Sequence, residues 1–330
     1  MPGAAKYVGL DVGGTTMKAA VVDDAGVAFP AVTLPTHPER GQEAGLETMC
    51  VAIRQAVSAA GLKLDDVTAV GVATPGLMDI QLGLILDPPN LKPWRNVEVP
   101  KTISTKLGKP VAFQNDANAA ALGEFWVGAG RDVDSFVMFT LGTGIGGGIV
   151  VDGNVLEGAH SHGGELGHLR IDLPDRGRLC GCGRRGCLEA YASATAVLAR
   201  TREEVPAYRG PTRLRSLLAQ KGEDLEAKDV FDAAAGGDPV ARKIVEDTAY
   251  YLALGACAIM ATVDPHMIAF GGGMIHAGES FLNTVTEYVG RFGLSYPASK
   301  VQIRYAKLGS DAGFIGAAAC ARDLVKGKKM

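Results

Sequence analysis

Three cysteines lie within eight residues of one another and could bind a metal ion. Cys180, Cys182 and Cys187 have the spacing C-x-C-x₄-C, and the glycines between them allow the chain to turn tightly around one point. Zinc in a structural site takes four ligands, commonly cysteine thiolates and histidine nitrogens. The segment therefore predicts a zinc site with three cysteine ligands and a fourth ligand from elsewhere in the chain.

A histidine can supply the fourth ligand. The preceding segment HSHGGELGH contains His160, His162 and His168, and spacing alone leaves the choice among them open. Redox chemistry is disfavoured because a C-x-x-C pair is absent, and a disulfide would leave one of the three thiols over. A Cys₃His site has no open coordination position, so we expect the metal to have a structural role.

Asp116 is the candidate catalytic base. It stands in the segment QNDANAAALGE, where a strand gives way to an alanine-rich helix. A positioned carboxylate can take the proton from a hydroxyl group that attacks a phosphorus atom. The alternative is that Asp116 only caps the helix, because Asp and Asn are favoured at helix N-caps.

Glycine-rich turns could hold a phosphate chain. The segments DVGGTT (Asp11 to Thr16) and LGTGIGGG (Leu141 to Gly148) each follow a strand, and neither is a Walker A loop. Glycines let the backbone approach an oxyanion closely, and a carboxylate such as Asp11 can hold Mg²⁺. A plain hairpin turn is the alternative for each. A third glycine segment, Gly271 to Met274, could face an adenosine or simply connect a strand to a helix.

The elements around these residues alternate between strands and helices in each half of the chain. Each half opens with a hairpin whose turn is rich in glycine, and helices dominate from Tyr191 to about Thr262. The segment from Gly153 to Glu189 is rich in loops. Because the order of elements repeats, we expect two similar α/β halves with a cleft between them. Functional residues of α/β folds lie at the carboxyl ends of strands.

Composition narrows the class of protein. The chain has 330 residues, of which 47% are hydrophobic and 21% charged, with a formal net charge of −3. These values predict two globular domains with no general attraction to nucleic acid or anionic membranes. The uncharged stretch from Thr248 to Val263 is shorter than a membrane span, so we expect a buried helix. We see no signal-peptide pattern or disulfide framework, and we expect a cytoplasmic protein.

Together these segments resemble the ROK family of sugar kinases and repressors. The resemblance is carried by DVGGT from Asp11, Asn115-Asp116, GELGH ending at His168 and CGCGRRGCLE ending at Glu189, and it covers nearly the whole chain. It implies an α/β fold of two actin-like, ribonuclease-H-like domains with a cleft between them. We expect a small domain at residues 1–117 plus 311–330 and a large domain at 118–310 that carries the zinc loop.

The resemblance also implies roles for individual residues. Asp116 matches the catalytic base, and His168 matches the histidine that binds zinc beside Cys180, Cys182 and Cys187. The residues implied for ATP and phosphate are Asp11, Gly13, Gly14, Thr15, Gly142, Thr143, Gly144, Gly271 and Gly272. The residues implied for the sugar are Gly76, Asn90, Asn115, Asp116, Glu165, His168 and Glu189. The cofactors implied are ATP with Mg²⁺ and a structural Zn²⁺.

The implied activity is phosphoryl transfer from ATP to the 6-hydroxyl of a hexose, with glucose as the first expected acceptor. N-acetylmannosamine, N-acetylglucosamine, mannose, fructose and allose are alternatives, because family members that use them share nearly the same residues. A polyphosphate-using glucokinase and a sugar-sensing regulator are further alternatives. The regulator is disfavoured because repressors of the family carry an N-terminal helix-turn-helix domain, whereas the first phosphate turn here starts at residue 11. We expect a homodimer that binds a small-molecule sugar and ATP, with no nucleic acid and no membrane partner.

Overall fold

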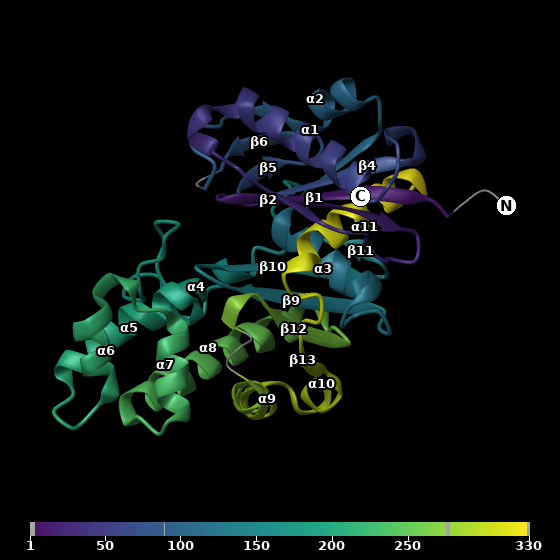
Figure 1. Ribbon diagram of the computed structural model, residues 1–330. Coiled ribbons are helices and arrows are strands. Elements are labelled where there is room, and N and C mark those ends of the chain that lie inside the picture. Colours follow the sequence, from purple (N-terminus) through teal and green to yellow (C-terminus); the bar gives the residue numbers. More distant parts are fainter. Residues whose placement is uncertain (1–3, 89, 275–277, 329–330) are drawn as a thin grey trace. The chain divides into compact units, whose positions relative to one another are not determined.

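Two five-stranded sheets share one topology in the computed structural model, which describes residues 4–88, 90–274 and 278–328. The first sheet has the strand order β3-β2-β1-β4-β8, and the second has the order β11-β10-β9-β12-β13 (Figure 1). In both sheets three consecutive strands lie side by side, and the next two strands are added beyond the first of them. The two similar α/β halves predicted from the sequence are therefore confirmed.

The strands are short, as is usual for a domain of this size. Those of the first sheet are β1 (Lys6–Val12), β2 (Thr16–Asp23), β3 (Val32–Pro35), β4 (Ala69–Thr74) and β8 (Val111–Asn115). Those of the second sheet are β9 (Ser135–Leu141), β10 (Ile145–Val151), β11 (Asn154–Val155), β12 (Met267–Gly271) and β13 (Gln302–Tyr305). A small third sheet, which the sequence pattern does not predict, contains β5 (Leu77–Asp79), β6 (Leu84–Asp87) and β7 (Val97–Glu98).

Eleven α-helices lie in the described residues. The helices that precede the second sheet are α1 (Gln42–Ala59), α2 (Val99–Leu107) and α3 (Asp116–Val127). The later ones are α4 (Glu189–Ala192), α5 (Ala194–Ala207), α6 (Arg213–Lys221), α7 (Ala227–Ala235), α8 (Pro239–Val263), α9 (Glu279–Phe292), α10 (Ser295–Lys300) and α11 (Ala312–Val325). The segment predicted to be rich in loops contains only β11 and one short 3₁₀ helix, Leu166–His168, before α4 begins.

The chain divides into two compact units. Unit 1 contains Met1–Phe136, Gly148–Gly164 and Lys307–Met330. Unit 2 contains Val137–Gly147 and Glu165–Ala306. The domain boundaries expected from the sequence, 1–117 plus 311–330 and 118–310, stay a prediction.

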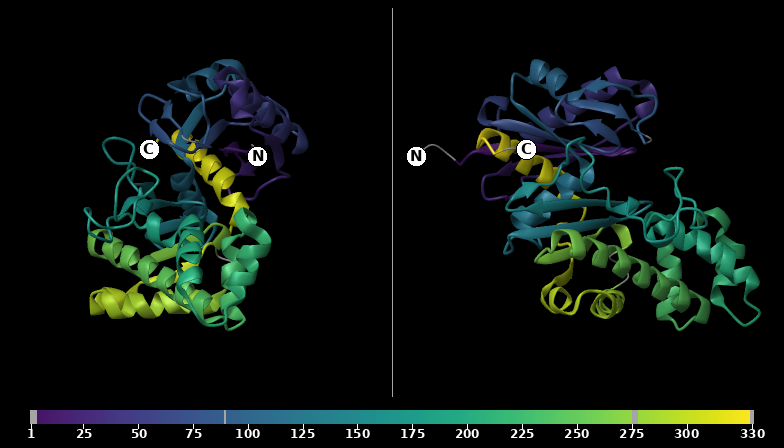
Figure 2. Two further views of the ribbon diagram at one scale, coloured as in Figure 1. Left: turned by 90° about the vertical axis from the view of Figure 1, so that its left-hand side faces the viewer. Right: turned by 180° about the vertical axis from the view of Figure 1, so that it is seen from behind.

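Unit 1 packs helices on both faces of the first sheet because the residues of β1 alternate between the faces. Val8, Leu10 and Val12 belong to a buried cluster that includes residues of α1, whereas Tyr7 clusters with Phe314 of α11. Figure 2 shows α11, in yellow, lying along β1, although the two are about 300 residues apart in sequence.

Glycines allow the backbone of α11 to lie directly against the backbone of the first sheet and against the backbone of α3. A Cβ atom at Gly9 would come within 1.8 Å of the Phe314 carbonyl oxygen, and one at Gly71 within 1.7 Å of the Ala317 carbonyl oxygen. On the side of α3, a Cβ atom at Gly316 would meet the Ala119 carbonyl oxygen at 1.7 Å. These contacts tie α3 and α11 to one unit and fix the position of the helix that begins at Asp116.

Unit 2 contains the long apolar helix α8. The sequence predicted a buried helix from Thr248, and the helix is longer, running from Pro239 to Val263. By length and composition α8 is the one helix in the described residues that could span a membrane, and half of its most apolar window is buried. Because α7 and α9 pack against it, we interpret α8 as a core helix of unit 2.

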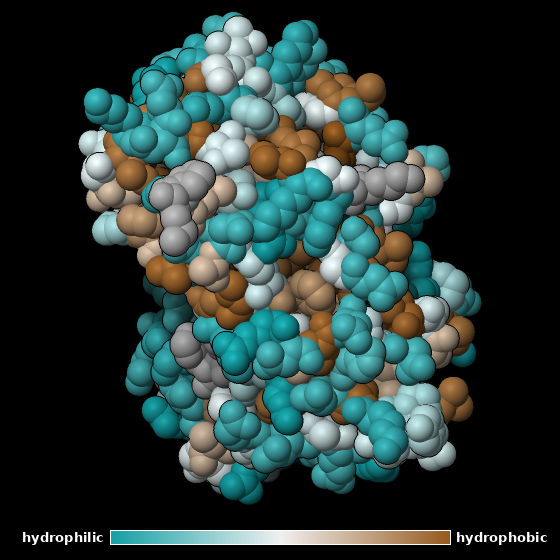
Figure 3. All heavy atoms as spheres, turned by 90° about the vertical axis from the view of Figure 1, so that its right-hand side faces the viewer, coloured by the Kyte–Doolittle hydropathy of each residue, from teal (hydrophilic) through white to brown (hydrophobic). Residues whose placement is uncertain are grey.

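The surface is mainly hydrophilic on the face drawn in Figure 3. Teal residues cover most of this view, and brown hydrophobic residues form small groups among them. Scattered apolar side chains are normal on the surface of a globular protein, so this face gives no indication of a large apolar binding surface.

Candidate functional site

The register of the first sheet brings three strand ends to one edge of unit 1. In the parallel pairs, Asp11 of β1 lies opposite Ala73 of β4, and Ala73 lies opposite Gln114 of β8. Because parallel strands end at the same edge, the residues that follow also gather there. Asp11 and the Asn115-Asp116 turn are thus neighbours, although about 100 residues separate them in sequence.

The N-terminus of α3 answers whether Asp116 is merely a cap. The cap residue is Asn115, whose Oδ1 accepts hydrogen bonds from the N–H groups of Ala117 at 2.9 Å and Asn118 at 3.3 Å. Asp116 is the first residue of the helix, and its Oδ1 also accepts from the N–H of Ala117, at 2.8 Å. Asn115 therefore occupies the N-cap position, Asp116 is an acidic residue of the first turn, and its role as catalytic base stays a prediction.

Asp11 is a carboxyl group in an unfavourable environment. Burial, together with the negative charge of Asp116, raises its pKa to about 7, and the charge of Lys18 opposes this shift. A Cβ atom at Gly313 would lie 2.2 Å from Asp11 Oδ2, so the first turn of α11 must have a glycine there. A buried carboxyl group with a raised pKa is typical of a functional site, because such a group is held in place at a cost in stability.

The first glycine turn joins β1 to β2 in unit 1. The N–H of Gly13 donates to the Thr16 carbonyl oxygen at 2.8 Å, and the Thr36 hydroxyl donates to the Gly13 carbonyl oxygen at 2.7 Å. A Cβ atom at Gly14 would lie 3.0 Å from the Asn90 carbonyl oxygen, so these two predicted site residues are neighbours. Gly76 follows β4 with a φ of 96°, a conformation that favours glycine.

The second glycine turn, Gly142–Gly144, joins β9 to β10 in unit 2. The N–H of Gly142 donates to the Gly144 carbonyl oxygen at 3.0 Å and closes the turn. Residues at the junction of α4 and α5 hold it from outside. The N–H of Ala194 donates to the Gly142 carbonyl oxygen at 2.9 Å, and the Thr195 hydroxyl donates to the Thr143 carbonyl oxygen at 2.7 Å.

A cavity of about 430 Å³ opens beside this second turn. Its polar floor includes Gly142, Thr143 and Thr195, and its apolar walls include Leu198, Leu225, Phe231 and Met274. Gly271 and Gly272, which the resemblance assigns to adenosine, directly precede the lining residues Gly273 and Met274. A cavity of this size with apolar walls and a few polar groups suits a nucleotide base and sugar.

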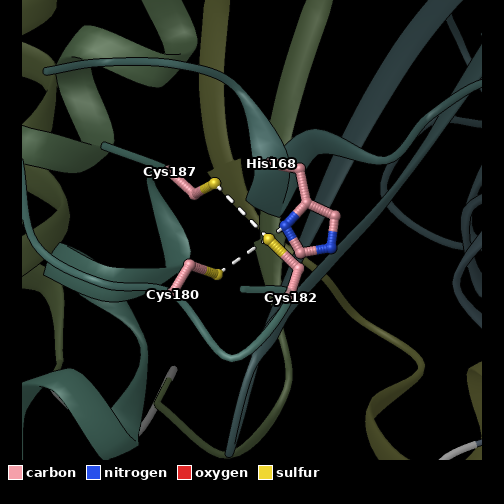
Figure 4. A group of neighbouring side chains, drawn as sticks. All are labelled: His168, Cys180, Cys182 and Cys187. Carbon is pink, nitrogen blue, oxygen red and sulfur yellow. Dashed lines mark hydrogen bonds between the residues drawn. The ribbon is translucent and has the colours of Figure 1, made fainter. Parts of the chain in front are cut away.

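Four metal-ligand atoms gather in the loop-rich part of unit 2. One ligand atom from each of His168, Cys180, Cys182 and Cys187 lies within 4.8 Å of every other (Figure 4). The Sγ atoms of Cys182 and Cys187 are 3.8 Å apart, and Cys180 Sγ is 3.9 Å from His168 Nδ1. Tetrahedral zinc with Zn–S bonds of about 2.3 Å separates two sulfurs by about 3.8 Å, so the donor set and its spacing fit zinc.

The same geometry selects among the three candidate histidines. His168 belongs to the cluster of ligand atoms, whereas His160 and His162 lie in the part of the loop that groups with unit 1. His168 Nδ1 faces the thiols, and its Nε2 is 4.0 Å from Glu165 Oε2. Burial raises the pKa of the Cys180 and Cys187 thiols, so a metal bound there must displace their protons.

The loop that contains Cys180, Cys182 and Cys187, here called the metal loop, is hydrogen-bonded to the helices that follow it. The Tyr191 hydroxyl donates to Asp172 Oδ2 at 2.5 Å and accepts from the N–H of Arg178 at 2.6 Å. The Arg178 guanidinium forms a bidentate pair with Glu203, at 2.6 and 2.8 Å. Arg178, which lies two residues before Cys180, is therefore paired with Glu203 of α5.

The predicted sugar residues of unit 2 form a chain of contacts around Cys180. Glu165 Oε2 is 4.0 Å from His168 Nε2, and the Cys180 thiol donates to Glu189 Oε1 at 3.4 Å. The other oxygen of Glu189 accepts from the N–H of Ile145 at 2.9 Å. Glu165, His168 and Glu189 are thus gathered in unit 2, and Gly76, Asn90, Asn115 and Asp116 belong to unit 1.

Two residues near the Asn115-Asp116 turn, Gln114 and Glu157, are not predicted from the sequence to belong to the site. Gln114, which is 1% exposed, accepts from the N–H of Asn115 through its Oε1 at 2.8 Å. Its Nε2 donates to Glu157 Oε1 at 2.7 Å, and burial raises the pKa of Glu157. Glu157 lies 43 residues from Gln114 in an irregular segment, so no periodicity links them. The apolar cavity residues Leu198, Leu225 and Phe231 are likewise indistinguishable from core residues in the sequence.

Comparisons with known proteins agree on one family. Residues 7–324 match the model of the ROK family. A glucokinase from Halalkalibacterium halodurans is 36% identical over 313 residues, which cover 94% of this chain and 93% of that protein. A solved ROK hexokinase from Thermus thermophilus is 35% identical, with a TM-score of 0.82, and the match covers 98% of this chain and 99% of that one. A solved ROK glucokinase from Streptomyces griseus, in complex with glucose and AMPPNP, is 33% identical, with a TM-score of 0.79 and coverage of 97% and 100%.

Proposed function

Because the chain belongs to the ROK family, we propose that it is an ATP-dependent kinase that phosphorylates glucose. Its fold is the two-domain actin-like α/β architecture of ROK sugar kinases, and it is a hexose kinase by its relatives. A glucokinase relative at 36% identity and a structural relative that binds glucose and AMPPNP support glucose as acceptor and ATP as donor.

The position of Asp116 is the observation that carries the proposal. Asp116 opens α3 at the same sheet edge as Asp11, and Asn115 rather than Asp116 caps the helix. A kinase needs a carboxylate there to accept the proton of the sugar hydroxyl.

Asp116 acts as general base in the proposed reaction. The proton of the sugar 6-hydroxyl passes to the carboxylate of Asp116 while the hydroxyl oxygen forms a bond to the γ-phosphorus of ATP. The bond between that phosphorus and the bridging oxygen breaks, and ADP leaves with its electron pair. The Mg²⁺ that accompanies ATP neutralises charge on the phosphoryl oxygens, and Asp11 is the proposed residue that faces it.

Two glycine turns are the residues proposed for the phosphates. In unit 1 the residues are Gly13, Gly14 and Thr15, and in unit 2 they are Gly142, Thr143 and Gly144. Backbone N–H groups in such turns stabilise the charge that develops on the phosphoryl oxygens. The cavity beside Gly142 holds the adenosine, with Gly271 and Gly272 at its border.

The residues that the family resemblance implies for the sugar provide the polar groups of the proposed sugar site. Gly76, Asn90 and Asn115 come from unit 1, and Glu165, His168 and Glu189 come from unit 2. His168 has one ring nitrogen directed at the thiols and the other directed at Glu165, so a metal on Nδ1 would fix the orientation of Nε2 toward a sugar hydroxyl. We propose that zinc, held by His168, Cys180, Cys182 and Cys187, is structural because the four protein ligands fill its coordination sphere.

Two alternatives to an ATP-dependent kinase receive less support. Polyphosphate has no base or ribose, and it would make no use of the apolar walls around Phe231 and Leu225. A sugar-sensing regulator needs no general base, so it gives no reason for Asp116. We propose no nucleic-acid and no membrane partner.

We propose a cytoplasmic homodimer. Tyr250, Tyr288 and Phe292 pack together on α8 and α9. Leu294 and Tyr296, which follow Phe292 in the chain, are 71% and 73% exposed. Exposed aromatic side chains of this kind are typical of subunit contacts. Light scattering during size-exclusion chromatography would give the mass, and that of a monomer at micromolar concentration would contradict the dimer.

An activity panel tests the proposed function. ADP release from MgATP is measured with glucose, mannose, fructose, allose, N-acetylglucosamine and N-acetylmannosamine, and polyphosphate replaces ATP in a parallel series. We expect glucose with MgATP to give the highest kcat/KM. Another sugar in first place would correct the acceptor. Tight sugar binding, seen as a thermal shift, without turnover from either donor would contradict a kinase.

A further inference from the structure

The carboxylate of Glu189 connects the metal loop with the second glycine turn. Glu189 is the first residue of α4 and follows Cys187, a candidate metal ligand, by two positions. Its Oε2 accepts a hydrogen bond from the N–H of Ile145, the residue after the turn, at 2.9 Å. A Cβ atom at Gly144 would lie only 2.4 Å from the same oxygen, so the carboxylate also packs directly against the turn.

The segment that begins at Glu189 holds the turn at two further points. Ala194 donates its N–H to the Gly142 carbonyl oxygen, and the Thr195 hydroxyl donates to the Thr143 carbonyl oxygen. These hydrogen bonds fall on Gly142 and Thr143 at one end of the turn and on Ile145 just after its other end, so they fix both ends of the turn. Gly142, Thr143, Ala194 and Thr195 also line the cavity that we assign to the nucleotide.

The start of α4 is itself fixed by the metal loop. The N–H of Leu188 donates to the Leu169 carbonyl oxygen at 2.9 Å, next to His168, and the N–H of Ala190 donates to the Cys187 carbonyl oxygen at 3.0 Å. Leu188 is fully buried, and its side chain packs against Gly255 of α8. The metal ligands, Glu189 and the glycine turn therefore form one continuous set of contacts within unit 2.

We propose that Glu189 is a positioning residue for the nucleotide. Its carboxylate holds the β9–β10 turn in the conformation that receives the phosphates, and an intact metal loop holds Glu189. This inference rests on the proposed function, because it takes the turn and the cavity as the nucleotide site. It adds a second role to the sugar contact that the family resemblance implies for Glu189, and it predicts that the metal loop supports nucleotide binding even when no sugar is present.

Nucleotide affinity measured without sugar separates the two roles. MgADP is titrated calorimetrically into the full zinc-loaded chain and three variants, and zinc content is determined for each protein. Glu189→Ala removes the acceptor for the Ile145 N–H, and we expect it to weaken MgADP about ten-fold, the value of one hydrogen bond to a charged group. Glu189→Gln keeps an acceptor oxygen and is expected to restore most of this affinity. Glu287→Ala, which removes an exposed carboxylate on α9 outside the proposed site, is expected to leave it unchanged.

The outcomes distinguish this inference from the proposed function. If wild-type protein binds no MgADP, the nucleotide site itself is wrong. If wild-type protein binds and Glu189→Ala binds equally well while losing glucose affinity, Glu189 is only a sugar contact and the inference is overturned. Equal losses in Glu189→Ala and Glu287→Ala would overturn it as well.

A further variant, Thr195→Val, tests the inference if Glu189→Ala loses zinc. Thr195→Val removes a different hydrogen bond to the turn, keeps the side-chain shape and lies outside the metal loop. With zinc retained, Thr195→Val should weaken MgADP several-fold and leave glucose affinity unchanged. Unchanged MgADP affinity in this variant would overturn the inference, because it would show that loss of a hydrogen bond to the turn does not affect the nucleotide.

Discussion

Burial and the negative charge of Asp116 together raise the pKa of Asp11 to about 7. The two carboxyl groups come from opposite sides of β4, because β1 and β8 both pair with it in parallel. Such a pair is unfavourable in the folded protein, and the charge of Lys18 offsets this only in part. Its presence at the carboxyl edge of the sheet is the strongest structural indication of a site for a metal-bound phosphate.

Asp116→Asn should reduce kcat by about 10²- to 10⁴-fold, the usual contribution of a general base. The fold should persist because Asn115 supplies the helix cap, and glucose should still bind. Steady-state kinetics and a glucose titration by intrinsic fluorescence measure the two effects. Substantial remaining turnover would show that Asp116 is not the base.

Asp11→Asn should make the protein without ligands more stable at high pH. An Asp with a pKa near 3.8 in the unfolded chain and about 7 in the folded one binds its proton more tightly when folded. Its stabilising contribution is complete below about pH 3.8 and is lost as the pH rises through 7. We therefore expect Asp11→Asn to raise the free energy of unfolding by about 4 kcal/mol at pH 8 and to change it little near pH 4.

Urea unfolding of wild type and Asp11→Asn at several pH values measures this effect. Asp24→Asn is a matched control, because a hydrogen bond from Lys326 lowers the pKa of Asp24 and the expected effect at pH 8 is a slight destabilisation. The same stability difference between Asp11→Asn and wild type at every pH would contradict the raised pKa. Activity of Asp11→Asn with MgATP should fall even though the protein is more stable.

Glu157→Leu should lower kcat about ten-fold with little change in the KM for MgATP. The substitution leaves the buried Nε2 of Gln114 without its acceptor, at a cost of about 1–3 kcal/mol. Gln114 also accepts a hydrogen bond from the N–H of Asn115, which is next to the base Asp116 in sequence. Glu157→Gln keeps an acceptor and should recover most of the activity. A purely structural role would instead lower the melting temperature of Glu157→Leu and leave kcat of the folded fraction unchanged.

Cys182→Ser should lose the metal. We expect about one zinc per chain in wild type and little in the variant, because a serine hydroxyl is a poor replacement for a thiolate. Glucose affinity should fall, since His168 and Glu165 lose their fixed orientation, and the melting temperature should fall with it. Cys257→Ser, outside the cluster, should keep its zinc. Equal zinc content in all three proteins, measured by atomic emission, would contradict the Cys₃His site.

The sequence predicts those parts of the structure that depend on local patterns. The hairpins with glycine turns, the loop-rich segment before Glu189 and the long apolar helix are all found, because turn residues and hydrophobic runs act over a few positions. The cysteine spacing predicts a ligand cluster for the same reason. The choice of His168 follows from the family resemblance, and the structure places that histidine with the three thiols.

Contacts between distant segments are what the sequence leaves open. Gly316 of α11 packs on Ala119 of α3 through backbone atoms, so no side-chain pattern in the sequence predicts this contact. Gln114 and Glu157 meet only because the irregular segment after β11 returns to β8. The strands β5, β6 and β7 have only two to four residues each, which is too short for a periodic signal.

The central claim is that this chain transfers the γ-phosphoryl group of ATP to the 6-hydroxyl of glucose with Asp116 as the base. The most direct test is ³¹P NMR of a mixture of glucose, MgATP and catalytic amounts of protein, with Asp116→Asn in a parallel sample. The account predicts that glucose 6-phosphate and ADP appear in equal amounts with wild-type protein and that the variant forms almost none. ADP with free phosphate instead of glucose 6-phosphate, or equal rates in both samples, would contradict it.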